Sequence, residues 1–269
     1  MADVDMYALL EQISEVAAEA GERILEVYNT EFEVDTKSDD SPLTAADLAA
    51  NGVISAALEA LQPRYPILSE ESSKASYETR RAWHRYWLVD PLDGTREFVK
   101  RNGEFTVNIA LIESGVPILG VVYVPVTGVC YAAARGVGAF KTDDAHVKRD
   151  IRVKPEASGK LTVVGSRSHS NAATEAFVGR LGEVDMISIG SSLKICMVAE
   201  GRADIYPRFG PTSEWDTAAA HCVVEQAGGR LTDLSLRTLE YNAKESVLNP
   251  FFLVFGDSSY DWGQHIEDA

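Results

Sequence analysis

The sequence predicts an α/β fold in two portions, an antiparallel-rich first part and a second part in which strands and helices alternate. Three observations support this. Apolar residues recur at helical spacing near the start, short apolar runs follow one another from about residue 67 to 133, and beyond residue 160 such runs alternate with helical patterns. We expect the portions to span residues 1–155 and 156–269, with the boundary between about 150 and 158.

The first portion begins with an amphipathic helix over residues 5–28, about six turns long. A second helix is expected from near Thr44 through Leu58 and Leu61. Short apolar runs then predict strands at 67–68, 86–89, 106–112, 116–124 and 129–133. The strands at 106–112 and 116–124 are expected to form a hairpin through Glu113-Ser114-Gly115.

The second portion follows a polar stretch from Lys141 to Asp150, after which strand and helix patterns alternate. Strands are expected at 161–165, 185–189, 204–206 and 251–255. Helices are expected at 171–181, 193–200 and 217–226.

The charge balance excludes some partners. With 25 Lys and Arg against 41 Asp and Glu, the formal net charge is −16, which argues against binding a nucleic acid polymer through its phosphates. A small anion can still bind where cations carry it. No run of about 18 apolar residues and no basic segment before an apolar stretch occurs, so we expect a cytoplasmic protein. Three distant cysteines suggest neither a disulfide framework nor a zinc site.

Five acidic residues stand at the ends of expected elements, where side chains can reach a cleft from a rigid scaffold. They are Asp47, Glu70, Asp90, Asp93 and Asp216. Singly, each has an ordinary explanation: Asp47 fits a capping box with Thr44, Asp216 fits a helix N-cap, and Glu70 fits a solvated loop. Pro, Asp and Gly in DPLDGT, residues 90–95, are also common turn residues.

Together the same carboxylates are the oxygen ligands that Mg²⁺ prefers. Two such ions at about 3.5–4 Å would clamp the attacking and leaving oxygens of an in-line phosphoryl transfer. Spacing alone does not bring these residues together, so a turn and a metal site both remain open at this point.

Four ordered motifs carry a resemblance to a known family. They are SPLTAAD at 41–47, LSEE at 68–71, WLVDPLDGT at 87–95 and EWDTAA at 214–219, the last followed by AGG at 227–229. Over nearly its whole length the chain resembles the magnesium-dependent, lithium-sensitive phosphatases of the inositol monophosphatase superfamily. The resemblance implies a layered αβαβα sandwich of the inositol monophosphatase and fructose-1,6-bisphosphatase type, one compact unit with the active site between its two portions.

The resemblance also implies metal ligands. Glu70, Asp90 and the Leu92 carbonyl would hold a first Mg²⁺, while Asp90, Asp93 and Asp216 would hold a second. A third, more weakly bound Mg²⁺ would have Glu70 and water as its ligands. Inhibition by lithium is expected on the same basis.

The catalytic roles follow the same resemblance. Thr95 would hydrogen-bond the attacking water, and Asp47 would orient Thr95 and accept its proton, with Glu70 also counted as catalytic. Backbone N–H groups of Gly94 and Thr95, at the start of a short helix, would receive the phosphate oxygens.

The residues after DPLDGT point to a substrate. Arg96-Glu97-Phe98 stands where inositol phosphatases usually show Thr-Asn-Phe, and it resembles the bacterial 3′(2′),5′-bisphosphate nucleotidases. Arg96 replaces the lysine more often found there, which keeps the charge but changes the donor geometry. This subgroup removes the 3′-phosphate of adenosine 3′,5′-bisphosphate, giving AMP and phosphate in sulfur assimilation.

Three further stretches, at 165–169, 190–194 and 204–208, combine hydroxyls with a cation and suit a second phosphate or a ribose. The expected substrate-binding residues are Glu70, Asp93, Gly94, Thr95, Arg96, Ser166, His169, Gly190, Ser191, Lys194, Arg208 and Asp216. Alternatively, His169 is a surface residue, Arg208 pairs with Glu214, and Ser191 or Ser192 is an N-cap. Lys37, Asp39 and Asp40 are expected in a loop that closes over the site, or in a plain exposed turn.

Two other functions are open. An inositol-1-phosphatase or sugar bisphosphatase of the same fold is disfavoured by Arg96-Glu97-Phe98. A non-catalytic metal-binding regulatory protein is disfavoured by the presence of both Asp47 and Thr95, since binding alone needs no water-activating pair. The expected partner is a small nucleotide bisphosphate. The sequence leaves open a monomer or a homodimer, peripheral membrane association and use of the sulfated nucleotide.

Overall fold

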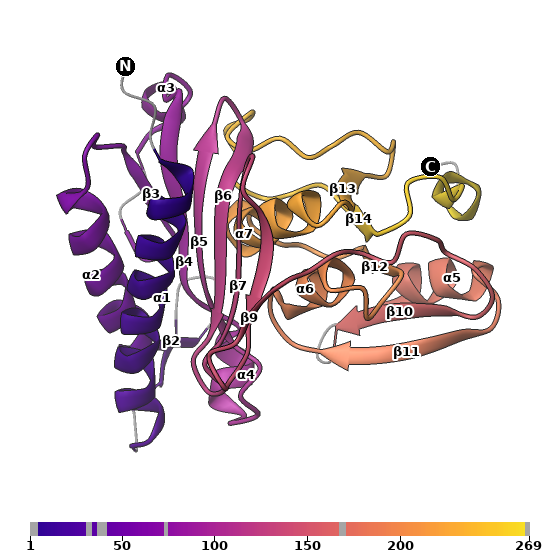
Figure 1. The fold of residues 1–269 in the computed structure, drawn as a ribbon, viewed down its shortest axis with the longest axis horizontal. Helices are drawn as coiled ribbons and strands as arrows, with labels where there is room; N and C mark the ends of the chain where they lie inside the picture. The colour runs from indigo at the N-terminus through magenta and orange to yellow at the C-terminus, as the bar shows by residue number, and fades with distance from the viewer. Residues whose placement is uncertain (1–4, 31–33, 37–41, 73–74, 167–170, 267–269) are drawn as a thin grey trace.

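The computed structural model describes residues 5–30, 34–36, 42–72, 75–166 and 171–266. Five layers follow one another in Figure 1. Helices α1 (Met6–Tyr28) and α2 (Ala45–Ala60) cover one face of a seven-stranded sheet, and helices α6 (Leu193–Ala199) and α7 (Glu214–Gln226) lie between that sheet and a five-stranded one. Helix α5 (Ala172–Arg180) packs beyond the second sheet. The αβαβα sandwich predicted for the chain is therefore confirmed.

The larger sheet runs in the order β3-β4-β5-β6-β7-β8-β9, and only β3 and β4 in it are parallel. Its strands are β3 (Ile67–Ser69), β4 (Arg85–Asp93), β5 (Thr106–Glu113), β6 (Val116–Val124), β7 (Val129–Ala134), β8 (Gly138–Thr142) and β9 (Lys148–Asp150). The predicted β5–β6 hairpin is confirmed. Its turn needs two left-handed residues, Ser114 with φ 50° and Gly115 with φ 81°.

The smaller sheet runs in the order β11-β10-β12-β14-β13, with β10 parallel to both of its neighbours and the other pairs antiparallel. Its strands are β10 (Leu161–Ser166), β11 (Val184–Ile189), β12 (Ile205–Arg208), β13 (Arg230–Asp233) and β14 (Phe252–Phe255). Short elements complete the described chain: β1 (Val34–Thr36), β2 (Pro42–Thr44), α3 (Tyr77–Arg80), α4 (Thr95–Val99) and the 3-10 helix η1 (Trp262–His265).

Most predicted elements are confirmed within a few residues, and the differences have local causes. Strands β8, β9 and β13 were not predicted. The three residues of β9, Lys-Arg-Asp, are all exposed and give no apolar signal. Helix α7 begins at Glu214, three residues before the predicted start, because Ser213 and Asp216 form a capping box. Reading Asp216 as the N-cap is therefore wrong: it is the third helical residue, and its Oδ2 accepts from Ser213 N at 2.8 Å.

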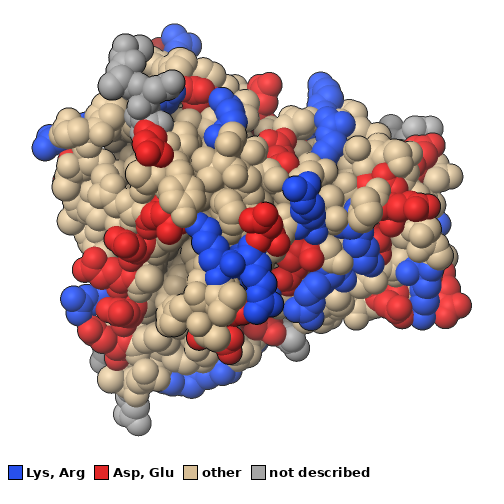
Figure 2. Space-filling model, in the orientation of Figure 1, with Lys and Arg blue, Asp and Glu red and all other residues tan. Residues whose placement is uncertain are grey.

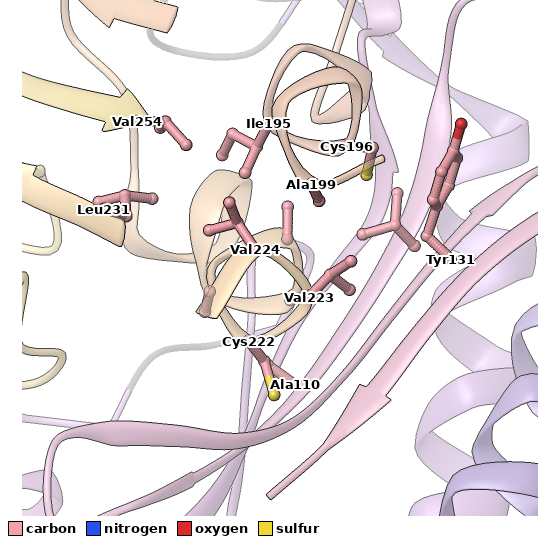
Figure 3. Close-up of a cluster of buried hydrophobic side chains, with 14 of the residues drawn as sticks. Ala110, Tyr131, Ile195, Cys196, Ala199, Cys222, Val223, Val224, Leu231 and Val254 are labelled. Carbon is pink, nitrogen blue, oxygen red and sulfur yellow. The ribbon is translucent and has the colours of Figure 1, made fainter. Parts of the chain in front are cut away.

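The core around α7 fixes how closely this helix approaches the larger sheet. Cys222, Val223 and Val224 of α7 lie between side chains of the two sheets (Figure 3). At the contact with β6 a Cβ on Gly120 would stand 2.2 Å from the Ala219 carbonyl oxygen, so only glycine fits there. The small residues Ala218 to Ala220 make the same approach possible from the helix side. Helix α7 is thereby seated firmly against the larger sheet.

All three cysteines are free and buried. On the face in Figure 2, Lys and Arg side chains are interspersed with Asp and Glu rather than joined into one basic surface. Among the described helices, none combines the length and apolarity that crossing a bilayer requires. The division into portions 1–155 and 156–269 stays a prediction.

Candidate active site

A pocket of about 270 Å³ opens where β4 ends, and it is bounded by residues of both sheets and of α6 and α7. It gathers most of the residues that the sequence predicted for the site. These are Glu70, Asp90, Leu92, Asp93, Gly94, Thr95, Arg96, Ser166, Gly190, Ser191, Lys194, Arg208 and Asp216. Of the remaining predictions, Asp47 is buried but does not line the pocket. His169, Lys37, Asp39 and Asp40 lie outside the described residues.

The end of β4 combines a turn with a cluster of polar groups. The pairing of β4 with β5 shifts register between Asp90 and Asp93, which ends the regular ladder. Asp90 Oδ1 then accepts from Leu92 N at 3.1 Å, and Gly94 follows with a left-handed φ of 95°. Helix α4 begins at the next residue, Thr95. The turn and the site, alternatives in the sequence, are therefore one structure.

Gly94 also makes room inside the pocket. A Cβ there would stand 3.3 Å from the Glu104 carbonyl oxygen and 3.4 Å from Ser191 Cβ. Its positive φ is unfavourable for any residue with a Cβ. Glycine at this position therefore lets the backbone before α4 lie close to Glu104 and Ser191 beside the pocket.

The carboxylates repel one another. Burial raises the pKa of Asp90 well above its ordinary value, and the charge of Glu70 is the next cause, followed by three further carboxylates. Burial and then Asp93 likewise raise the pKa of Asp216. Burial raises the pKa of Asp93, although Lys194 and hydrogen bonds from Ser192 oppose it. Buried carboxylates in this number are stable when ionised only if cations neutralise them.

The donor set fits a hard divalent cation such as Mg²⁺, since the four carboxylates predicted as ligands share one pocket with the Leu92 residue. In the described part of the chain, no three His, Cys, Asp or Glu side chains already stand in a metal-coordinating arrangement. The fit therefore rests on the chemistry of the donors and on their mutual repulsion. Asp216 uses Oδ2 to cap its helix, which leaves its second oxygen for a ligand.

Ser192 lines the pocket but was not among the predicted substrate-binding residues. It occupies the N-cap of α6, as one of the two predicted alternatives has it, although its side chain makes no capping bond. Its N–H donates to Asp93 Oδ2 at 2.6 Å, and its hydroxyl lies 2.7 Å from the same oxygen and 2.6 Å from the Asp216 carbonyl oxygen. Asn108 Nδ2 donates to the hydroxyl at 2.8 Å. Asn108, polar in an otherwise apolar strand, was the signal that could have revealed this link.

Thr95 and Asp47 lie on different helices at the site. Thr95 opens α4 and lines the pocket, while Asp47 is in the first turn of α2 and 1% exposed. Asp47 is near enough to contribute to the raised pKa of Asp90, whose largest cause is burial. The pairing of Asp47 with Thr95 stays a prediction.

Helix α6 and strand β12 each contribute a cationic side chain to the pocket. Lys194 is buried, and its Nζ donates to the Ser191 carbonyl oxygen at 2.6 Å, which ties it to a residue with a left-handed φ of 47°. Burial lowers the pKa of Lys194 to about 8, against the opposing charge of Asp93. Arg208 Nη2 donates to the Pro211 carbonyl oxygen at 2.9 Å.

The predicted alternative that Arg208 pairs with Glu214 is wrong. Glu214 is buried and its Oε2 accepts from Asn242 N at 2.9 Å instead. Arg208 faces the pocket, where it adds to the cationic side chains around Lys194.

Comparisons with known proteins agree on one family. The family model described as "Inositol monophosphatase family" matches residues 5–256. The chain is 53% identical over 248 residues to the 3′(2′),5′-bisphosphate nucleotidase CysQ of Salmonella typhimurium, covering 91% of this chain and 99% of that protein. It is 52% identical to the protein of the same name from Escherichia coli, with the same coverage.

Solved structures show the same relationship. The crystal structure of CysQ from Bacteroides thetaiotaomicron, described as a bacterial member of the inositol monophosphatase family, matches with a TM-score of 0.84 and 42% identity. The match covers 94% of this chain and 99% of that one. The inositol monophosphatase of Anabaena matches with a TM-score of 0.75 and 25% identity, over 98% and 96% of the two chains. The chain belongs to the inositol monophosphatase family.

Proposed function

We propose that the protein is a magnesium-dependent phosphatase that removes the 3′-phosphate of adenosine 3′,5′-bisphosphate, giving AMP and phosphate. One observation carries this proposal: a single pocket combines carboxylates from β4 and α7 with the cations Lys194 and Arg208 from α6 and β12. A substrate with two phosphates suits this pocket. One phosphate can bind to metal held by the carboxylates, and the other can bind to the cationic side chains. The name shared by the relatives at 52–53% identity supports the same substrate.

The metal would be held by the pocket's oxygen donors. Those assigned to Mg²⁺ are Glu70, Asp90, the Leu92 carbonyl, Asp93 and Asp216. When bound, Mg²⁺ activates the attacking water and neutralises charge on the phosphoryl group. We propose two or three ions, and inhibition by lithium, from the family resemblance.

The protein's own groups would do the rest of the chemistry. Thr95 orients the attacking water and Asp47 accepts the proton, while the N–H groups of Gly94 and Thr95 hold the phosphate oxygens. The water oxygen bonds to phosphorus as the bond to the ribose 3′-oxygen breaks, and that oxygen takes up a proton from solvent water to become the 3′-hydroxyl of AMP. The attacking water oxygen and the leaving 3′-oxygen lie in line with the phosphorus, which requires the phosphate to be held in one orientation.

The second phosphate and the nucleoside would bind at the cationic part of the pocket. Lys194 and Arg208 are assigned to the 5′-phosphate, with Ser166, Ser191 and Gly190 around it. Arg96 is exposed at the pocket and would guide the substrate in. His169 is retained as a proposed contact. We further propose that the protein acts in the cytoplasm, in sulfur metabolism, as a monomer or homodimer.

A side-by-side assay tests this function. Phosphate release with Mg²⁺ is measured from adenosine 3′,5′-bisphosphate, inositol-1-phosphate and fructose-1,6-bisphosphate. We expect the highest kcat/KM for the nucleotide. A higher value for either other substrate would mean that the enzyme is an inositol or sugar phosphatase. A second measurement uses the variant Asp93→Asn, which replaces one proposed metal ligand. Near-normal turnover with this variant would contradict the metal assignment.

A further inference from the structure

Helix α7 carries a buried polar stripe that the proposed hydrolysis does not use. Thr217, His221 and Glu225 follow one another at a spacing of four, so they lie on one face of the helix. Thr217 lines the pocket and His221 is fully buried, while the Glu225 side chain is 27% exposed. The stripe therefore leads from the pocket wall toward the surface.

Tyr241 joins the members of this stripe. Its hydroxyl lies 3.2 Å from Thr217 Oγ1 and 2.9 Å from His221 Nδ1. Its backbone N–H donates to the Gly115 carbonyl oxygen at 2.9 Å, which fixes the tyrosine to the β5–β6 hairpin. The Tyr241 side chain is 1% exposed. The hydroxyl thus links the pocket wall to a rigid part of the larger sheet.

Asn249 completes the set of contacts at the pocket end. Its Nδ2 donates to Thr217 Oγ1 at 3.0 Å and to the Ser213 carbonyl oxygen at 2.7 Å. Ser213 is the N-cap of α7. The first turn of α7 is therefore held through both its cap and its fourth residue.

Glu225 forms the outer end of the polar stripe. Burial alone would raise the pKa of the Glu225 carboxyl, but His221 and nearby arginines lower it on balance, so the group is ionised and only accepts. His221 Nε2 lies 3.2 Å from Glu225 Oε1, at an angle that falls short of a well-formed hydrogen bond.

The Tyr241 hydroxyl shares one hydrogen bond with His221 Nδ1 and another with Thr217 Oγ1. Thr217 Oγ1 also accepts from Asn249 Nδ2 and donates to the Glu214 carbonyl oxygen at 3.2 Å. Removing the Tyr241 hydroxyl deprives the buried His221 Nδ1 of this partner, and an unpaired buried polar atom costs more than an average hydrogen bond contributes.

We propose that Tyr241 and His221 are positioning residues for the pocket, which hold Thr217 and with it the first turn of α7 that carries Asp216. Asp93 repels Asp216, so the backbone that carries Asp216 needs a support that resists displacement. Gly120 fixes the middle of the same helix, at Ala219, but not its first turn. The assignment rests on the proposed function in one respect, because the task of Asp216 there is to hold Mg²⁺.

The test compares two buried tyrosines. Tyr241→Phe removes the linking hydroxyl, and Tyr131→Phe is the matched control, since Tyr131 is 2% exposed and does not line the pocket. Mg²⁺ affinity of the substrate-free protein is measured by calorimetry, and hydrogen exchange of residues 213–218 by mass spectrometry. We expect Tyr241→Phe to weaken Mg²⁺ binding about tenfold and to speed exchange, and Tyr131→Phe to do neither.

A conservative variant separates positioning from loss of packing. His221→Asn keeps an amide that can accept from Tyr241, whereas His221→Leu keeps only bulk, so exchange in residues 213–218 should be slower in the Asn variant. Equal Mg²⁺ affinity and equal exchange in the two Tyr→Phe variants would overturn the proposal. If the wild-type protein hydrolyses no nucleotide but the exchange difference remains, the proposed function fails and the positioning role stands.

Discussion

Ser192 holds Asp93 with two hydrogen bonds to the same oxygen, one from its N–H at 2.6 Å and one involving its hydroxyl at 2.7 Å. The same hydroxyl lies 2.6 Å from the backbone carbonyl oxygen of Asp216. One residue at the start of α6 thus connects the Asp93 carboxylate of β4 with the backbone of Asp216 in α7. The relative placement of these two proposed metal ligands depends on a third element.

Replacing Ser192 with Ala should weaken Mg²⁺ binding about tenfold, because partners that orient metal ligands typically contribute that much. The change also leaves Asn108 Nδ2 without its acceptor. The measurement is Mg²⁺ titration by calorimetry. Ser14→Ala is the control, since the Ser14 hydroxyl donates to the Leu10 carbonyl oxygen within α1 and does not line the pocket. Equal affinities in the two variants would mean that Ser192 has no role in holding Asp93.

Replacing Thr95 with Ala should lower kcat by at least about 100-fold while KM changes little, because general-base assistance acts mainly in the transition state. Steady-state kinetics with adenosine 3′,5′-bisphosphate at saturating Mg²⁺ provide the test. A raised KM with unchanged kcat would instead make Thr95 a substrate-binding residue without a role in activating water.

The pKa of Lys194 predicts a pH dependence. Burial lowers this pKa to about 8, so Lys194 is a cation below that pH and becomes neutral as the pH rises through it. Its attraction for the 5′-phosphate should fade in the same range, and kcat/KM should therefore fall above about pH 8. Lys194→Met should have a lower kcat/KM without that decline. An identical alkaline limb in both proteins would assign the decline to another group.

Gly120→Ala should destabilise the fold by about 1–3 kcal/mol, because overpacking a tight contact typically costs that much. The added methyl group would meet the Ala219 carbonyl oxygen of α7. Gly52→Ala is the control: Gly52 is exposed in α2 with nothing within 4 Å of its Cβ position, so the change should stabilise by about 1 kcal/mol. Urea unfolding measures both free energies, and equal shifts would contradict the close packing of α7.

The sequence predicted much of the pocket because its residues stand at the ends of elements. Asp90 follows the apolar run of β4, and Asp216 lies in the first turn of α7. Spacing along the chain cannot bring β4 and α7 together, and the motifs of the family resemblance supplied that link. The alternation of strands and helices beyond residue 160 predicted four of the five strands of the second sheet, all but β13, because apolar runs mark buried strands.

What the sequence could not predict depends on contacts between distant residues. The bonds of Ser192 to Asp93 span 99 residues, and the Asn108 contact spans 84. Strand β9 has no apolar pattern, since sheet pairing with β8 alone defines it. The earlier start of α7 follows from a capping box whose Ser213 was not recognised as a cap.

The central claim is that the carboxylate part of the pocket cleaves the 3′-phosphate while Lys194 and Arg208 hold the 5′-phosphate. Separation of the products formed from adenosine 3′,5′-bisphosphate and Mg²⁺ by chromatography tests it most directly. The account predicts 5′-AMP and one phosphate per substrate consumed. Adenosine 3′-phosphate as the product, or no phosphate release at all, would contradict it.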